Sequence, residues 1–131
     1  MSNRVAMVTG AAQGIGKGIA TALAADGFRV AVADLNLAAA EQGAKEITAA
    51  GGTAIAVEID VTRTASVESA VRAVEAVLGP VEVVVNNVGW DDFMPFVKTT
   101  EEFWDKILDI NFKGSQQVGL AVRSAIARTC G

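Results

Sequence analysis

The 131-residue sequence contains no histidine, no tyrosine and a single cysteine. Without histidine or tyrosine, the chain cannot form a histidine-based catalytic triad, use histidine as a metal ligand or transfer a proton through a tyrosine. The lone Cys130 excludes a disulfide within one chain and a cysteine-based metal site. We therefore expect no metal site and a reducing, cytoplasmic setting.

The sequence also lacks a concentration of positive charge and a long apolar run. Its eleven basic residues are scattered and its formal net charge is −4, which argues against nucleic acid or an anionic membrane surface as a partner. No apolar run approaches the roughly 20 residues that span a bilayer, and Met1–Arg4 carries no apolar signal segment. We expect a small-molecule partner, no nucleic acid and no membrane.

About half of the residues are hydrophobic and a fifth are charged, which suits one globular domain or part of one. Apolar segments with strand character alternate with segments of helical periodicity. The predicted strands are 4–9, 28–34, 53–59 and 81–85, and the predicted helices are 15–26, 36–51, 62–78 and 99–128. This alternation predicts an α/β fold with a doubly wound parallel sheet of the Rossmann type, about four strands in the order 3-2-1-4.

Finer details follow from the helical patterns. The first helix is expected to bury Ile15, Ile19, Ala22 and Leu23. Thr62 is the expected N-cap of the third helix and Thr99 that of the last, because Thr99 and Glu102 have capping-box spacing. A bend is expected in the last helix between residues 111 and 114.

The first strand runs into a glycine-rich turn and then a helix, with glycines at Gly10, Gly14 and Gly16. Glycine permits positive φ and close approach of a ligand, and a helix N-terminus suits a pyrophosphate. A tight turn without a ligand is the alternative interpretation. The phosphate loop of nucleotide hydrolases is excluded, because Ala11 stands where that motif needs glycine and Gly18 replaces its hydroxyl residue.

Asp34 ends the second predicted strand, eighteen residues after Gly16. A carboxylate there can accept hydrogen bonds from the adenosine ribose and repel a 2′-phosphate, which favours NAD over NADP. Gln13 and Leu35 stand where a basic side chain would commonly meet that phosphate. The alternative is an aspartate that only caps the turn before the next helix.

Together these motifs resemble the short-chain dehydrogenase/reductase family along the whole chain. Thr9-Gly10 with Gly14 and Gly16 is similar to its cofactor motif, Asp60-Val61 to its adenine-contacting pair, and residues 86–89 (Asn-Asn-Val-Gly) to its N-N-A-G segment. The resemblance implies that the catalytic contribution of this chain is Asn111, which would help to hold a water of the proton relay. The expected cofactor-binding residues are Gly10, Gln13, Gly14, Ile15, Gly16, Asp34, Leu35, Asp60, Val61, Asn86, Asn87 and Gly89.

Two structural alternatives stay open within this resemblance. Asn86 could serve only to tie strand ends, and Asn111 only to satisfy backbone groups at a helix bend. Within the family, Gly89-Trp90-Asp91, residues 95–99 and Trp104 look most like the branch that oxidises cyclic hydroxyacyl-CoA thioesters.

The family's catalytic serine, tyrosine and lysine are expected beyond this chain, whose end falls just before the place of a fifth strand. We therefore expect residues 1–131 to be the amino-terminal, NAD-binding half of such an enzyme, inactive alone. An unpaired fourth strand would leave an apolar edge. We expect an isolated chain of marginal stability that forms a homo-oligomer or is completed by another polypeptide.

The leading functional hypothesis is an NAD-dependent oxidoreductase that transfers hydride between an alcohol or ketone, hydroxyacyl-CoA substrates included, and the nicotinamide. The alternative is a non-catalytic nucleotide-binding or interaction module derived from that family. A methyltransferase on a similar sheet is less favoured, because that function gives no reason for the Asn-Asn-Val-Gly segment.

Overall fold

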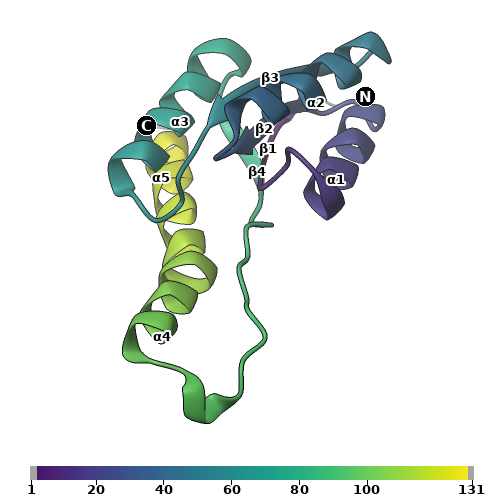
Figure 1. The fold of residues 1–131 in the computed structure, drawn as a ribbon. Coiled ribbons are helices and arrows are strands. Elements are labelled where there is room, and N and C mark those ends of the chain that lie inside the picture. The colour runs from purple at the N-terminus through teal and green to yellow at the C-terminus, as the bar shows by residue number, and fades with distance from the viewer. Residues whose placement is uncertain (1–2, 130–131) are drawn as a thin grey trace.

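The computed structural model describes residues 3–129 as a sheet covered by helices, with one segment projecting from it (Figure 1). The strands are β1 (Val5–Thr9), β2 (Arg29–Asp34), β3 (Thr53–Glu58) and β4 (Val81–Val85). The helices are α1 (Gly14–Ala25), α2 (Leu37–Ala49), α3 (Thr64–Leu78), the 3-10 turn η1 (Phe96–Lys98), α4 (Glu101–Leu108), the π-helical turn η2 (Asp109–Lys113) and α5 (Gly114–Thr129).

The strands form one four-stranded sheet in the order β3-β2-β1-β4. Every neighbouring pair is parallel, and β1 lies in the middle with all five of its residues buried. The predicted fold class and strand order are confirmed. Because β1 is covered on both faces, its sequence is a continuous apolar run rather than an alternating one.

Two hydrophobic cores lie on opposite faces of the sheet. Met7 of β1 packs in the cluster that includes Val71 of α3 and Val118 of α5. Val8, its neighbour, packs in the cluster that includes Ala20 of α1 and Ile47 of α2. Successive strand residues point to opposite faces, so α1 and α2 cover one face of the sheet and α3 and α5 the other.

The face that α1 buries differs from the predicted one. Its buried residues are Gly16, Ala20 and Ala24, whereas Ile15 is 79% exposed and Ala22 is exposed. The prediction was wrong for Ile15 and Ala22, although Ile19 and Leu23 are half-buried as members of the same core. Small residues form the contact face because the first turn of α1 lies close to the backbone of the preceding turn.

Both predicted threonine caps were wrong by one residue. The N-cap of α3 is Arg63, and Thr62 bonds to Asp60 instead. The N-cap of α4 is Thr100, whose hydroxyl accepts a hydrogen bond from the Phe103 N–H at 3.2 Å. The Thr99 hydroxyl donates to the Phe96 carbonyl at 2.6 Å and accepts from the indole N–H of Trp104 at 2.8 Å.

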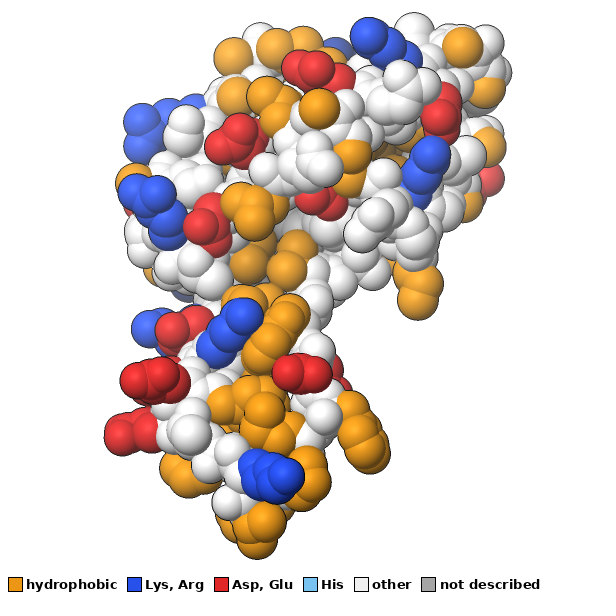
Figure 2. All heavy atoms as spheres, viewed as in Figure 1, with side chains coloured by type: hydrophobic (Ala, Val, Ile, Leu, Met, Phe, Trp, Pro, Cys, Tyr) orange, Lys and Arg blue, Asp and Glu red, His pale blue; other side chains and the backbone are white. Residues whose placement is uncertain are grey.

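The π-helical turn η2, Asp109–Lys113, lies where the sequence predicts a bend in the last helix. It separates α4 from α5 and belongs to a segment, residues 89–113, that we call the arm. The arm projects from the sheet (Figure 1) and carries much of the exposed apolar surface, which Figure 2 shows over the projecting part. No helix within residues 3–129 is both long enough and apolar enough to cross a membrane.

Candidate functional site

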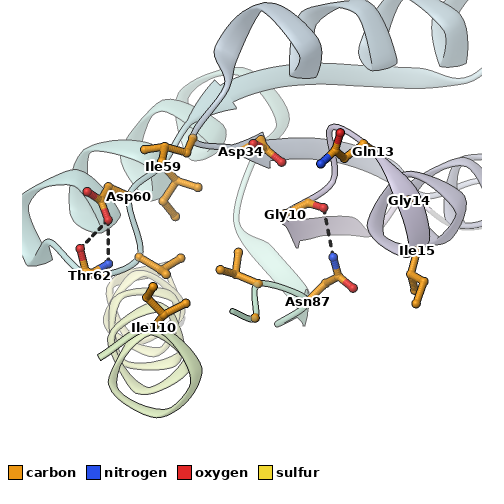
Figure 3. Close-up of a pocket in the computed structure, with 14 residues that line it drawn as sticks. Gly10, Gln13, Gly14, Ile15, Asp34, Ile59, Asp60, Thr62, Asn87 and Ile110 are labelled. Carbon is orange, nitrogen blue, oxygen red and sulfur yellow. Dashed lines mark hydrogen bonds between the residues drawn. The ribbon is translucent and has the colours of Figure 1, made fainter. Parts of the chain in front are cut away.

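A cleft of about 480 Å³ opens where the carboxyl ends of β1, β2 and β4 meet (Figure 3). Ligands of open α/β sheets bind outside the carboxyl ends of the strands at such a switch point. The lining residues are Gly10, Gln13, Gly14, Ile15, Asp34, Leu35, Ile59, Asp60, Val61, Thr62, Asn87, Val88, Gly89 and Ile110.

The glycine turn forms one wall of this cleft. Gly10 and Gly14 have φ angles of 64° and 61°, a region that residues with a Cβ rarely adopt. Gly16 is buried behind the turn, where a Cβ would lie 2.3 Å from the Gly10 carbonyl oxygen and 2.5 Å from Nδ2 of Asn87. The turn therefore requires glycine for its backbone conformation and for close packing, and it brings the start of α1 to the cleft.

Asp34 lies at the end of β2 and faces the glycine turn. Its Oδ2 accepts a hydrogen bond from the Ala12 N–H at 3.0 Å, and its Oδ1 accepts one from the Asn36 N–H at 2.9 Å. A carboxylate has about four lone-pair sites, so both oxygens keep capacity for a ligand. The side chain is held between the turn and the start of α2.

Asp60 provides the second carboxylate of the lining. Its Oδ1 accepts hydrogen bonds from the hydroxyl of Thr62 at 2.6 Å and from the N–H of Thr62 at 3.0 Å. The hydroxyl bond is the main reason why the pKa of Asp60 lies below its usual value. The Asp60 N–H donates to Oγ of Ser66 at 2.8 Å, which fixes the loop that follows β3.

Thr9 and Asn87 join the ends of β1 and β4. Oγ1 of the buried Thr9 accepts hydrogen bonds from the N–H groups of Asn87 and Val88, at 3.1 and 3.4 Å, and donates to the Val85 carbonyl at 3.3 Å. Nδ2 of Asn87 donates to the Gly10 carbonyl at 3.0 Å (Figure 3). Asn86 is exposed and does not line the cleft.

Asn111 lies in η2, outside the lining of the cleft. Its side-chain amide makes two hydrogen bonds to the main chain of Trp90, accepting from the N–H and donating to the carbonyl, each at 2.8 Å. The Trp90 ring packs edge-on against Phe103 and beneath Nζ of Lys106, which lies 3.8 Å from the ring centroid. The Asn111 amide therefore anchors the start of the arm.

The structure brings most of the predicted cofactor-binding residues to one cleft and leaves Gly16, Asn86 and Asn111 outside its lining. Sequence reasoning missed Ile59, Thr62, Val88 and Ile110 as lining residues. Thr62 had a usable signal, because a threonine two residues after a strand-ending aspartate can bond back to that carboxylate. Ile110 had none, since its place depends on how the arm returns to the sheet.

Charge in the cleft has one sign. Asp34 and Asp60 line it, and none of the described lining residues is a lysine or an arginine. Lys17, in the first turn of α1, pairs with Glu46 of α2 at 2.8 Å. Within residues 3–129 there is no group of three acidic, histidine or cysteine residues arranged to hold a metal ion, and Cys130 lies outside the described residues.

Comparisons with known proteins agree with this geometry. The family model described as short chain dehydrogenase matches residues 4–129. The chain is 41% identical over 132 residues to galactitol 2-dehydrogenase of Agrobacterium fabrum, a match that covers 100% of this chain and 50% of that protein. It is 38% identical to sorbitol dehydrogenase of Cereibacter sphaeroides, which covers 98% of this chain and 47% of that protein.

A solved short-chain type dehydrogenase/reductase from Mycobacterium marinum superimposes with a TM-score of 0.93 at 31% identity, over 98% of this chain and 52% of that one. The chain thus spans about half the length of the relatives that it matches. Family model, sequence relatives and solved structure all point to one assignment, and the chain belongs to the short-chain dehydrogenase family.

Proposed function

We infer that residues 1–131 supply the dinucleotide-binding half of a short-chain dehydrogenase that uses NAD. The observation that carries this proposal is the carboxylate of Asp34, which lines the cleft across from the glycine turn. Its two oxygens suit the hydroxyls of an adenosine ribose and repel a 2′-phosphate. The described lining residues offer no lysine or arginine to attract that phosphate.

Each remaining wall of the cleft has a role in this proposal. The turn from Gly10 to Gly14 and the start of α1 bind the pyrophosphate through backbone N–H groups. Gly16 permits the close packing behind the turn, and Asp60 and Val61 contact the adenine. The other residues proposed to contact the cofactor are Gln13, Ile15, Leu35, Asn86, Asn87 and Gly89.

A bound nicotinamide would supply the hydride acceptor or donor for an alcohol or ketone substrate. Asn111 is proposed to serve the proton relay through its main chain, because both polar groups of its side chain are bonded to Trp90. The names of the polyol dehydrogenases similar to this chain favour a small polyol or hydroxyketone. The hydroxyacyl-CoA branch remains an alternative that rests on residues 89–104 alone.

This chain has no tyrosine, so the tyrosine-dependent proton transfer must come from outside residues 1–131. We propose that the active form is a cytoplasmic homo-oligomer whose subunits carry the serine, the tyrosine and the lysine outside residues 1–131. A module that binds the nucleotide without catalysis is the second candidate, favoured by that same absence. The intact mass of the native gene product separates them, since the isolated chain has a mass of 13.5 kDa and a complete enzyme about twice that.

Titration with NADH and NADPH tests the cofactor assignment. Wild type should bind NADH more tightly than NADPH, and Asp34→Ala should weaken NADH binding about tenfold, since hydrogen bonds to a charged group are lost. The same variant should narrow the difference between the two cofactors. Glu41→Ala, at an exposed carboxylate on α2, is the matched control and should change neither affinity. Unchanged discrimination in Asp34→Ala would contradict the assignment.

A further inference from the structure

Asp34 accepts hydrogen bonds from the glycine turn and from the residue that precedes α2. A contact between Asp34 and a ribose would not by itself connect these two parts of the structure. Ala12 lies in the glycine turn, between Gly10 and Gly14, and is buried. Its N–H points to Oδ2 of Asp34 at 3.0 Å. The adjacent Ala11 N–H donates to the carbonyl of Ala33 at 3.1 Å, so β2 holds two successive N–H groups of the turn.

We propose that Asp34 is a positioning residue for the phosphate-binding turn as well as the residue that reads the ribose. Its carboxylate is the acceptor for the Ala12 N–H, and it fixes the turn before any cofactor arrives. The expected effect on the affinity of this turn for a pyrophosphate rests on the proposed function. The bond itself belongs to the cofactor-free protein.

The chemistry of the side chain makes this role hard to replace. Asp34 accepts from two N–H groups, one on each oxygen. An asparagine has the same shape but only one accepting oxygen, so Asp34→Asn must face either Ala12 or Asn36 with an NH₂ group. One of the two N–H groups then loses its acceptor. If this is the N–H of Ala12, the loss falls in a turn whose backbone has positive φ at Gly10 and Gly14. Substitutions of Asp34 that are meant only to change the choice of cofactor should therefore also weaken the hydrogen bonding of the glycine turn.

Amide hydrogen exchange of the cofactor-free protein, followed by NMR, tests the bond directly. In Asp34→Ala, which removes both acceptor oxygens, the Ala12 amide should exchange about tenfold faster than in wild type, because a charge-assisted bond is lost. Ala11 should change less, since its acceptor is a main-chain carbonyl. Asp60→Ala is the matched control, because Asp60 is the other carboxylate of the cleft and accepts its hydrogen bonds from Thr62, outside the glycine turn.

Unchanged exchange at Ala12 in Asp34→Ala would overturn the proposal, because neither acceptor oxygen remains in that variant. Equal acceleration at Ala12 in both variants would also overturn it, because the cause would then be general destabilisation. Protection of the buried β2 amides of Val30 and Val32 reports whether each variant keeps its fold.

A second measurement tests whether the hydrogen bond between Ala12 and Asp34 affects phosphate binding by the glycine turn. Reduced nicotinamide mononucleotide lacks the adenosine half and cannot reach Asp34 through its ribose, so a pure ribose contact predicts no change in its affinity. With the proposed positioning role, Asp34→Ala should weaken its binding about threefold, while the control Glu41→Ala, at an exposed position of α2 outside the cleft, should not. If wild type fails to bind NADH at all, the proposed function fails, and the exchange at Ala12 still decides the positioning role.

Discussion

The sheet and the arm both contain large apolar side chains, but the sheet buries them and the arm exposes many of them. In the sheet, Met7 and Val8 of β1 are fully buried. Hydrogen bonds of the Thr9, Asp34 and Asn87 side chains join the strand ends to each other and to the glycine turn. In the arm, the side chains of Phe93 and Phe96 are 103% and 80% exposed. The arm is organised mainly by local pairs, among them Phe96 stacked on Trp104 with ring centroids 6.5 Å apart.

The cleft and the arm therefore depend on different parts of the chain. The cleft at the carboxyl ends of the strands is assembled almost entirely from residues 9–88, which pack and hydrogen-bond among themselves. The arm presents aromatic side chains, Phe93 and Phe96 among them, with no covering layer among the described residues. The contrast predicts that substitutions near β1 act on folding, whereas substitutions on the arm act locally.

The largest effect should come from Gly16→Ala. A Cβ at this position would lie 2.3 Å from a carbonyl oxygen and 2.5 Å from the Asn87 amide nitrogen, so strands and turn must move apart, at about 3 kcal/mol of unfolding free energy. Urea unfolding measures the loss. Gly18→Ala, on the same helix and with no atom within 4 Å of the new Cβ, should instead stabilise by up to about 1 kcal/mol. Equal effects of the two would refute the close packing.

The next effect compares the two regions directly. Met7→Ala removes a fully buried side chain and should lower the unfolding free energy by about 2–3 kcal/mol. Phe96→Ala removes a larger side chain that is 80% exposed and should change it by less than about 0.5 kcal/mol. Chemical denaturation of both variants gives the comparison, and a large loss in Phe96→Ala would show that the arm is part of the cooperative core.

A smaller and local effect is expected at the joint between the regions. Asn111→Ala removes both hydrogen bonds to the Trp90 main chain, worth about 1–3 kcal/mol together. Limited proteolysis should cut the loop after Trp90 faster, while the midpoint of global unfolding moves little. Gln116→Ala, at an exposed position of α5, is the control and should leave the cleavage rate unchanged.

The smallest effect concerns Asp60 and depends on pH. Its pKa is lower in the folded chain, chiefly because of the Thr62 hydroxyl, so the bond stabilises the fold above the unfolded pKa of about 3.9 and loses this effect as pH falls through the folded value. Thr62→Val should reduce stability by about 0.5 kcal/mol at pH 7, since the pair is accessible to solvent, and by almost nothing at pH 2. A loss of the same size at both pH values would contradict the assignment.

The sequence predicts the sheet well because its signals are local and strong. Each strand is a mostly apolar run that ends in a polar residue or, for β4, is followed by one, and the glycines at Gly10 and Gly14 occupy the positive-φ positions. These signals sufficed for the strand order and for Asp34 in the cleft. Periodicity alone failed on α1, because it cannot register that Gly16 must approach a carbonyl and that Ile15 faces the cleft.

Side-chain hydrogen bonds were harder to predict than elements. Asn87 and Asn111 were expected near the cofactor, and the structure shows their amides bonded to the main chain of Gly10 and Trp90. Such bonds join positions far apart in the sequence, 77 residues in the case of Asn87. Their partners depend on how the β1 and β4 ends meet, which no local pattern encodes.

The carboxylates of the cleft bear on how a dinucleotide would approach it. A pyrophosphate is negative, and Asp34 and Asp60 line the cleft without a lysine or arginine among the described lining residues. Long-range repulsion therefore opposes encounter, and mobile ions damp it beyond a Debye length of about 10 Å at 0.1 M. The backbone N–H groups that attract the phosphates act only at contact. The association rate of a dinucleotide should stay constant or increase as ionic strength rises. The opposite is expected for enzymes whose arginine and lysine side chains attract a negatively charged ligand.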